Sequence, residues 1–401
     1  MSNHILVGLD IGSSTIKSLA VMPKKEDATF EILSQVSEPA RGIRRGLITN
    51  TAEVSEVIAS VLQKTQNECG KKIEDVFVNI GGCHIFSKNS RGTIIVSRAD
   101  EKISEEDIER AIQAAQTFSL PANREILQVF PKGFIVDGET KIQQPLGLEG
   151  VRLEAEILVV GYFTPYFKNL TKAVLDAGYQ ISHIICNPIA SASAVLTAQE
   201  RELGTLLIDI GAGTTSFCVY QENTLMTVGI IPIGSFNITA DIATGLATHI
   251  DTAEQIKLKF GICGSRAQKT IKIKEQESGE MLSFSQKKLN NIIEARVLEI
   301  LQEIQKKVKS VGPFSFPGGV VLCGGGAYLP KIKDFSKKSL KMACRIGKPK
   351  GFFPKIDSPD LSCVAGLILD GQDFSEPSPP ISRIFKTILE KIKKMLKDLI
   401  P

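Results

Sequence analysis

A short motif of aspartate, glycine and hydroxyl residues occurs twice in the chain, and its residue types suit the binding of phosphate. Residues 9–15 read LDIGSST, and residues 208–214 read IDIGAGT. Each copy lies between two β-compatible runs, so each predicts a strand, a tight turn and a second strand. Glycine permits such a turn, and the successive backbone N–H groups within it form a concavity suited to phosphate oxygens.

The aspartate of each copy, Asp10 and Asp209, would stand at the end of a strand beside its turn. A carboxylate in that position can hold Mg²⁺ through water, because this ion keeps most of its hydration shell. Two opposed turns could therefore clamp a triphosphate from both sides. The glycines 324–326, which follow the apolar run 319–323 and are expected to open a helix, would let the backbone approach a ribose or purine closely. Each feature alone is more often a plain turn, but the three in this order indicate a nucleotide-binding cleft.

The sequence lacks the motifs of several other nucleotide and metal sites. No Gly-x-x-x-x-Gly-Lys-[Ser/Thr] sequence occurs, which excludes a P-loop. Residues 211–213 supply two glycines but not the third of the dinucleotide-binding fingerprint, and they lead into a strand where that fingerprint opens a helix. Both points argue against a dinucleotide-binding fold. Four histidines and eight cysteines show no ligand spacing, so we assign them no metal and expect reduced thiols.

The elements that must position these residues follow from periodicity. The two copies of the motif predict two homologous halves. Apolar spacing and capping residues predict helices over 51–66, 165–177, 188–197, 239–260 and 287–311, strands over 76–80, 181–186 and 319–323, and a hairpin or loop over 263–285. The pattern changes over 83–162, where a helix opened by Ser104 lies among the strand-like runs 92–97, 125–130, 133–136 and 151–160. We interpret 83–162 as an inserted subdomain.

Length and composition agree with this organisation. A chain of 401 residues is expected to form at least two folding units, and 43% apolar with 23% charged residues is ordinary for a globular protein. These values exclude a disordered chain, a collagen and a coiled-coil rod. No 18 consecutive residues are all apolar, so no membrane-spanning helix is expected. The first ten residues lack a basic region and reach Asp10 early, so no signal peptide is expected.

The net charge of the chain is concentrated at its end. Residues 381–401 hold six basic and two acidic side chains, and this excess of four equals the net charge of the whole chain. Apolar residues recur there in steps of three and four, with basic residues on the opposite face. A proline-containing segment, 375–380, precedes this stripe. The pattern is typical of a helix that lies on an anionic membrane surface, and it does not indicate nucleic-acid binding. The membrane-facing set comprises Ile384, Phe385, Ile388, Ile392 and Leu396, with Lys391 and Lys394 beside it.

With these motifs the chain resembles the actin/sugar kinase/chaperone ATPase superfamily and, within it, the FtsA family of bacterial actin-like cell-division proteins. The resemblance covers about residues 4–400. It rests on the two turns and on the segments 41–48, 103–108, 187–191, 237–243, 254–257, 292–296, 324–327 and 364–366. It implies an α/β fold: an actin-like, ribonuclease H-like duplicated, two-lobed ATPase with an inserted subdomain and a C-terminal amphipathic helix.

The resemblance also implies a division of the chain. The first lobe would comprise 1–82 and 163–203 and be closed by 359–371, with the FtsA-type insert at 83–162. The second lobe would have its core at 204–231 and 301–358 and its upper subdomain at 232–300. A linker would occupy 372–380 and the membrane-targeting helix 381–400.

Site residues are implied in the same way. One phosphate loop would be lined by Gly12, Ser13, Ser14 and Thr15, with Lys17 reaching the phosphates, and the other by Gly211, Ala212, Gly213 and Thr214. Gly234, Glu254 and Lys257 would contact diphosphate, ribose and base, and Gly325, Gly326 and Ala327 would complete the adenosine site. Asp10 and Asp209 would organise Mg²⁺ through water, and Arg296 would contact a partner.

The implied function is an ATP- and Mg²⁺-binding cell-division protein at the division site. It would polymerise with itself at the inner face of the cytoplasmic membrane, bind anionic lipids, and tether the C-terminal tail of FtsZ and other division proteins. Two positions depart from the family: Ser235 follows Gly234 in place of a second glycine, and Cys186-Asn187 stand where relatives such as MreB carry a glutamate that can orient the attacking water. We therefore assign no catalytic residue and expect at most a slow ATPase.

Two alternatives remain at this point. The pilus-assembly protein PilM shares the turns and a similar insertion, but it needs no lipid anchor of its own. A sugar kinase of the same superfamily would need a carboxylate base and a sugar cleft, and the sequence offers no clear candidate for either.

Overall fold

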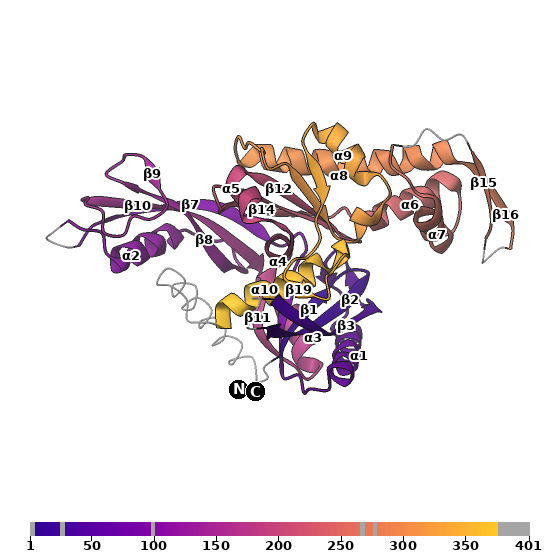
Figure 1. Ribbon diagram of the computed structural model, residues 1–401, viewed down its shortest axis with the longest axis horizontal. Helices are drawn as coiled ribbons and strands as arrows, with labels where there is room; N and C mark the ends of the chain where they lie inside the picture. Colours follow the sequence, from indigo (N-terminus) through magenta and orange to yellow (C-terminus); the bar gives the residue numbers. More distant parts are fainter. Residues whose placement is uncertain (1–4, 25–28, 98–100, 265–268, 276–278, 376–401) are drawn as a thin grey trace.

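The computed structural model describes residues 5–24, 29–97, 101–264, 269–275 and 279–375, with side chains described to residue 371. Two lobes stand one above the other, and a third unit extends sideways from them (Figure 1). At the opposite end a two-stranded hairpin, β15–β16, projects beyond the upper lobe (Figure 1). The predicted membrane helix, 381–400, lies outside the described residues.

The first lobe is built on a six-stranded sheet with the order β11-β6-β1-β2-β3-β19. β1 pairs antiparallel with β2 and β2 with β3, whereas β1, β6 and β11 run parallel. The helices α1 (Thr51–Cys69) and α3 (Thr164–Asp176) belong to this lobe. The strands are β1 (Leu6–Ile11), β2 (Thr15–Lys24), β3 (Thr29–Pro39), β6 (Asp75–Ile80), β11 (Gln180–Cys186) and β19 (Phe352–Phe353).

The second lobe repeats this plan. Its sheet has the order β14-β13-β12-β17-β18, again with three antiparallel strands followed by parallel ones. The predicted duplication is therefore confirmed strand by strand. The elements are α5 (Ala198–Leu203), β12 (Thr205–Ile210), β13 (Thr215–Gln221), β14 (Thr224–Ile231), β17 (Val320–Cys323), α9 (Ile332–Leu340) and β18 (Cys344–Ile346).

Two helices, α4 (Asn187–Val195) and α10 (Ser362–Ser375), lie where the lobes meet (Figure 1). They cross so closely that a Cβ added to Gly366 would stand 1.7 Å from the carbonyl oxygen of Ala190. α10 also packs on β1, although the two are far apart in the chain. The first four residues of the predicted linker, 372–375, continue α10 instead, because the first proline that disfavours a helix comes only at Pro377.

The boundary drawn at 358 for the second lobe also needs correction. β19 comes from this part of the chain, yet Phe352 and Phe353 pair with β3 of the first lobe. The ring of Phe352 stacks on that of Phe30, with centroids 5.6 Å apart. The chain has thus returned to the first lobe before α10 begins.

The third unit is a four-stranded sheet with the order β7-β10-β8-β9 and the helix α2 (Glu105–Gln116). Its strands are β7 (Phe86–Ile95), β8 (Arg124–Val136), β9 (Lys141–Ile142) and β10 (Arg152–Phe163). The predicted cap is confirmed, since Ser104 and Asp107 form a capping box at the start of α2. The runs 125–130 and 133–136, expected to be separate, form the single strand β8, in which a register irregularity accommodates Pro131.

The inserted unit interrupts the sequence of the first lobe, but it packs against the second lobe. β7, β8 and β10 all contact β14, the edge strand of the upper sheet. The Ser87 hydroxyl of β7 donates a 2.7 Å hydrogen bond to the carbonyl oxygen of Val228. The inserted unit therefore bridges the two lobes on one side of the molecule.

The upper part of the second lobe contains the helices α6 (Ser235–Leu246), α7 (Ile250–Phe260) and α8 (Gln286–Val311) and the hairpin β15 (Thr270–Lys274)–β16 (Met281–Ser285). The hairpin confirms the expectation for 263–285. The single helix expected over 239–260 is wrong, because the chain turns at Ala247 in the left-handed region, with φ 53°. The turn lets Ile242 of α6 and Ile256 of α7 enter one core, where both are fully buried.

Candidate functional site between the lobes

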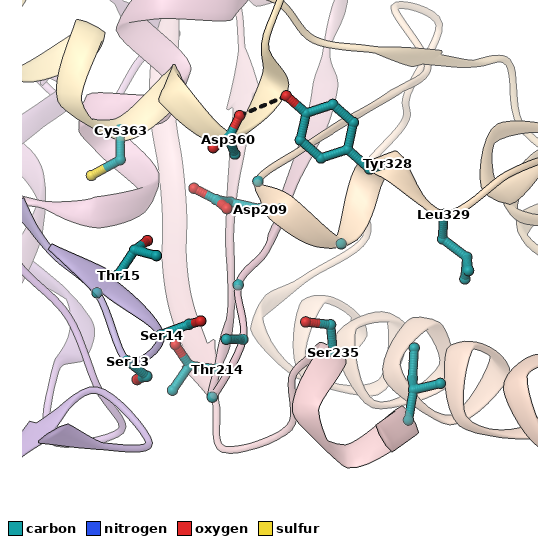
Figure 2. Close-up of a pocket in the computed structure, with 18 of the residues that line it drawn as sticks. Ser13, Ser14, Thr15, Asp209, Thr214, Ser235, Tyr328, Leu329, Asp360 and Cys363 are labelled. Atoms are coloured by element: carbon teal, nitrogen blue, oxygen red, sulfur yellow. Dashed lines mark hydrogen bonds between the residues drawn. The ribbon is translucent and has the colours of Figure 1, made fainter. Parts of the chain in front are cut away.

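A cavity of about 440 Å³ lies between the two lobes, with both glycine turns in its wall. Figure 2 shows Ser13, Ser14 and Thr15 of the first turn facing Thr214 of the second. Most of the residues predicted for the site line this cavity: Asp10, Gly12, Ser13, Ser14, Thr15, Lys17, Asp209, Gly211, Ala212, Gly213, Thr214, Glu254, Lys257, Gly325 and Gly326.

Two predicted residues do not line the cavity. Gly234 lies beneath the second turn, where an added Cβ would stand 2.4 Å from the carbonyl oxygen of Ala212. Its backbone N–H is already bonded to the Asn237 side chain at 3.0 Å. Ala327 is buried in the second lobe. Both residues are buried in the second lobe, and neither lines the cavity.

The two turns are closed by the same backbone hydrogen bond. Gly12 N–H donates to Thr15 O at 3.1 Å, and Gly211 N–H donates to Thr214 O at 2.9 Å. A Cβ added to either glycine would approach the acceptor oxygen to 2.8 Å or 2.9 Å. The sequence rule that places glycine after Asp-x thus has a steric cause in both lobes.

Asp10 is buried beside its turn, and Asp209 is partly buried beside the other. Asp10 Oδ1 accepts a 2.7 Å hydrogen bond from Asn79 Nδ2, and Asp209 Oδ2 accepts one of 2.6 Å from the Ser191 hydroxyl. Burial raises the pKa of Asp10, and it raises the pKa of Asp209 to about 6. A cation placed between them would remove this cost.

The donor set fits magnesium better than a metal bound only by side chains. Within the described parts of the chain, no group of three or more His, Cys, Asp and Glu side chains could hold a metal ion. Asp10 and Asp209 would therefore leave most coordination positions to water and to the ligand. This is the arrangement that Mg²⁺ favours, and Asp10 and Asp209 are the residues that would hold it.

Lys17 reaches the cavity but is already engaged there. Its ammonium donates to the Asp360 carboxylate at 2.9 Å and to the Asp360 carbonyl oxygen at 2.6 Å. The Tyr328 hydroxyl donates to the other carboxylate oxygen at 2.7 Å, as the dashed line in Figure 2 marks. Burial alone would lower the pKa of Lys17, but the nearby Asp10 and Asp360 raise it, so the lysine is charged.

The far wall of the cavity is formed by α6 and α7. Lys257 pairs with Glu254 at 2.7 Å and also donates to the Thr239 hydroxyl at 2.9 Å. Leu258 beside them is 71% exposed. Gly325 also lines the cavity, in a 3₁₀ turn (Gly325–Tyr328) where a helix was expected, and an added Cβ there would meet no atom within 4 Å. A flat ring could lie against Gly325, because this residue carries no side chain and the space beside it is open.

Sequence reasoning gave no binding role to several residues that line the cavity: Asn187, Ser235, Ile238, Leu258, Tyr328, Leu329, Pro330, Asp360 and Cys363. Ser235 and Asn187 were noted only as departures from a family pattern. Gly324 belongs to the predicted triple glycine, and its φ of +80° and an added Cβ only 2.2 Å from Asp209 Oδ1 explain why this position needs glycine. Asp360 carried no local signal, because its role depends on a lysine of the other end of the chain.

Arg296, predicted to contact a partner, lies outside the cavity. Its guanidinium holds both carboxylate oxygens of Asp241 at 2.6 and 2.7 Å and also pairs with Glu299. The bidentate pair joins α8 to α6. Arg296 therefore has a structural contact within the chain that the sequence analysis did not anticipate.

Comparison with protein families identifies two regions of the chain. The model described as "Cell division protein FtsA" matches residues 206–366, and the model described as "SHS2 domain inserted in FTSA" matches residues 82–161. The second match covers the unit formed by β7–β10 and α2.

Individual relatives lead to the same family. The cell division protein FtsA of Pseudomonas aeruginosa is 32% identical over 377 residues, which are 92% of this chain and 90% of that protein. FtsA of Borreliella burgdorferi is also 32% identical, over 99% of this chain and 98% of its own length.

Solved structures support the fold at lower identity. The PilM–PilN type IV pilus biogenesis complex contains a chain with TM-score 0.64 and 17% identity, covering 94% of this chain and all of that one. MreB5 of Spiroplasma citri bound to ADP gives TM-score 0.52 and 13% identity over 93% of this chain and 99% of that one. The fold is the actin-like, two-lobed one. The likeness to the PilM–PilN complex shows the fold alone, whereas the FtsA relatives are 32% identical over nearly the whole chain, so the chain belongs to the FtsA family of cell division proteins.

Proposed function

We propose that this protein binds ATP with Mg²⁺ between its lobes, polymerises at the inner face of the cytoplasmic membrane, and tethers FtsZ filaments to that membrane at the division site. The observation that carries the proposal is the pair of opposed turns with an aspartate behind each, Asp10 buried and Asp209 partly buried. The similarity of the fold to MreB5, which was solved bound to ADP, supports a nucleotide as the ligand.

Each part of Mg-ATP has a counterpart in the cavity. The N–H groups and hydroxyls of the turns, with Lys17, would face the phosphates, and Asp10 and Asp209 would hold the ion through water. Gly325 and Leu258 border the space suited to the adenine ring. Magnesium would neutralise the phosphates and offset the desolvation of the Asp10 and Asp209 carboxylates.

Calorimetric titration of the full chain with ATP and Mg²⁺ tests this site. Asp209→Ala should weaken binding through the metal, and Gly325→Val should weaken it by filling the space of the ring. Gly325→Val is a clean variant, because its side chain would enter open space and leave the fold intact. Gly312→Val is the matched control: an added Cβ there makes only an ordinary contact, with Phe314 at 3.9 Å, outside the cavity. If both site variants bind ATP as the parent does, the site is misplaced.

Hydrolysis should be slow. Asn187 stands in the cavity where a base would be needed, and its side-chain oxygen accepts a hydrogen bond from Asn79 at 3.1 Å. An amide cannot take a proton from water, and the neighbouring Cys186 is buried, which raises its thiol pKa to about 12. The nucleotide would act mainly as a conformational ligand. If the missing carboxylate is the reason for slow hydrolysis, Asn187→Glu should accelerate the release of phosphate from ATP.

Polymerisation would use the inserted subdomain, and the structure suggests where. Ile95, which pairs with Arg152 at the end of β7, and Val151, just before β10, lie at the same end of this sheet, and their side chains are 72% and 52% exposed. Exposed apolar side chains on a lateral unit suit a contact with a second copy. Deleting 84–161 should abolish filaments and keep ATP binding, but it also uncovers β14. Ile95→Asp with Val151→Asp is therefore the sharper test by electron microscopy, with Lys102→Asp on the same unit as the charge control.

The contact with the acidic tail of FtsZ is proposed for the subdomain 232–300. Arg296→Glu should weaken binding of a tail peptide, most visibly at low salt, but it also breaks the pair with Asp241. The swapped pair Arg296→Asp with Asp241→Arg separates the two effects, because it restores the contact between helices. Binding that returns in the swapped protein would remove Arg296 from the interface and leave it a purely structural role.

Membrane attachment is proposed for residues 381–400. No described helix of this chain combines the length and apolarity needed to cross a bilayer. Each basic residue near an anionic leaflet contributes about 1 kcal/mol, so one such helix would bind reversibly, and polymerisation would strengthen attachment by raising the effective concentration of anchors. Phe385→Glu with Ile392→Glu should release the protein from anionic liposomes while ATP binding survives. Equal co-sedimentation of this variant and the parent, at low and high salt, would contradict the assignment.

A further inference from the structure

A second cavity, of about 790 Å³, adjoins the first and shares the tips of both turns with it. Ser13, Ser14, Ala212 and Gly213 line both spaces. The outer wall of the second cavity includes Arg44 and Arg45 of the short hairpin β4 (Ile43–Arg44)–β5 (Leu47–Ile48). Two arginines therefore stand beside the point at which the two phosphate-binding turns meet.

The hairpin is fixed against both turns. The Gly46 N–H donates a 2.8 Å hydrogen bond to the Ser13 hydroxyl of the first turn. On the second turn, a Cβ added to Gly213 would stand 3.0 Å from the Cα of Arg45. Arg45 itself adopts φ 50°, the left-handed region that a non-glycine residue occupies at a cost. The tip of the hairpin is thus held in one place by contacts with both lobes.

The charged residues that the structure describes in the first cavity include no cationic side chain that is free to pair with a phosphate. Four acidic residues line it, against two basic ones. Both basic residues are already paired, Lys17 with Asp360 and Lys257 with Glu254. By contrast, neither Arg44 nor Arg45 has an ion-pair partner among the residues that the structure describes, and both side chains are exposed. The free cationic groups next to the turns are those of the hairpin.

We propose that Arg44 and Arg45 bind the terminal phosphate of a nucleoside triphosphate and make the site prefer the triphosphate over the diphosphate. The inference rests on the proposed function of the cavity. A triphosphate has one more phosphate group than a diphosphate, and this group adds about one negative charge at the turn tips. Guanidinium groups suit it, because their planar forks donate paired hydrogen bonds to phosphate oxygens.

Titration of the full chain with Mg-ATP, Mg-ADP and adenosine tests the inference. Arg44→Ala with Arg45→Ala should weaken Mg-ATP binding about tenfold to a hundredfold, Mg-ADP binding less than threefold, and adenosine binding not at all. The salt dependence of Mg-ATP binding should become shallower as two cations are lost. Replacing both residues by lysine should restore part of the preference, since charge is kept and the paired geometry is lost.

The control and the contrary outcomes are distinct. Arg41→Ala removes an exposed arginine of the same segment that lines neither cavity and lies 3.8 Å from Glu56, and it should leave all three affinities unchanged. A parent protein that binds neither nucleotide would overturn the proposed function itself. A parent that prefers ATP, with a double variant that keeps this preference or loses ATP and ADP equally, would overturn the role of the arginines alone.

Discussion

The two turns of the site share one backbone hydrogen bond but present different chemistry to the cavity. The first, Gly12-Ser13-Ser14, carries hydroxyls, and one of them holds the β4–β5 hairpin. The second, Gly211-Ala212-Gly213, carries no polar side chain, and an added Cβ at Gly213 would stand 2.8 Å from Ser13 Oγ. The first turn therefore presents polar side chains to the cavity, whereas the second presents only its backbone.

The difference continues in the strands that follow. β2 holds the buried Lys17, and the corresponding position of β13 is the buried Ser216. The aspartates differ too. Burial raises the pKa of both, but the next largest influence is the Lys17 charge for Asp10 and the hydrogen bond from Ser191 for Asp209. Duplication thus produced one frame with two specialised turns: the first supplies polar side chains, and the second supplies close backbone approach.

The largest effect should come from crowding the second turn. Gly213→Val would push against Ser13 and the backbone of Arg45, forcing the turns apart. Mg-ATP affinity should fall more than a hundredfold in calorimetry. Ser13→Val, the same side chain in the first turn, should cost tenfold at most because that turn already accommodates a Cβ. Equal losses in the two variants would erase the proposed distinction between the turns.

Asp209→Asn should stabilise the ligand-free protein at neutral pH and weaken Mg-ATP binding. A carboxyl whose folded pKa lies above its unfolded value of 3.8 loses stability as pH rises from about 4 to about 6, because the unfolded state ionises first. The gain at pH 7 should be on the order of 2–3 kcal/mol. Melting curves of both proteins at pH 4.5 and pH 7 without Mg²⁺ would show this gain. Between these two pH values the parent should lose more stability than the Asn variant. A parallel pH response in both proteins would contradict this.

Lys17→Met should lower Mg-ATP affinity about tenfold and also destabilise the protein, because Asp360 would keep its charge without its lysine. Lys17→Met with Asp360→Asn should regain stability and leave the affinity low. Thermal melting and titration of both variants separate the two roles of the lysine. If affinity returned together with stability, Lys17 would be a structural partner of Asp360 and have no contact with phosphate.

The smallest effect is expected from Ser13→Ala. The variant removes the 2.8 Å hydrogen bond from Gly46 and leaves this N–H without its partner. A loss of about 1 kcal/mol corresponds to about fivefold in affinity if the hairpin contributes to the site. Ala212 is the matching position of the second turn, and Ala212→Ser should change affinity less. A larger loss of affinity from Ala212→Ser than from Ser13→Ala would contradict the assignment of the polar contacts to the first turn.

Local signals in the sequence predicted the turns, their aspartates and most strands and helices. These features depend on neighbouring residues, as the hydrogen bond from Gly12 to Thr15 illustrates. The break at Ala247 escaped prediction because apolar spacing continues through it, and the two-residue strand β19 was too short to produce a pattern.

Long-range pairing explains what was missed in the site. Asp360 and Tyr328 became site residues only when folding brought them to Lys17, and nothing near them in the chain indicates a lysine. Arg296 shows the opposite case: an apparently solvated residue of α8 turned out to be tied to Asp241 of α6. Residue type and spacing therefore located the cleft, and only the fold assigned the partners within it.

The return of the chain to the first lobe has a consequence for the order of synthesis. The sheet of the second lobe is complete once Ile346 has left the ribosome. The first lobe still lacks β19 and α10 then, and its Gly8 cannot yet meet Val364, whose carbonyl oxygen would be 2.8 Å from an added Cβ. Apolar surface on β1 stays uncovered until these last elements arrive. Synthesis therefore supplies the whole sheet of the second lobe before it supplies the last elements of the first.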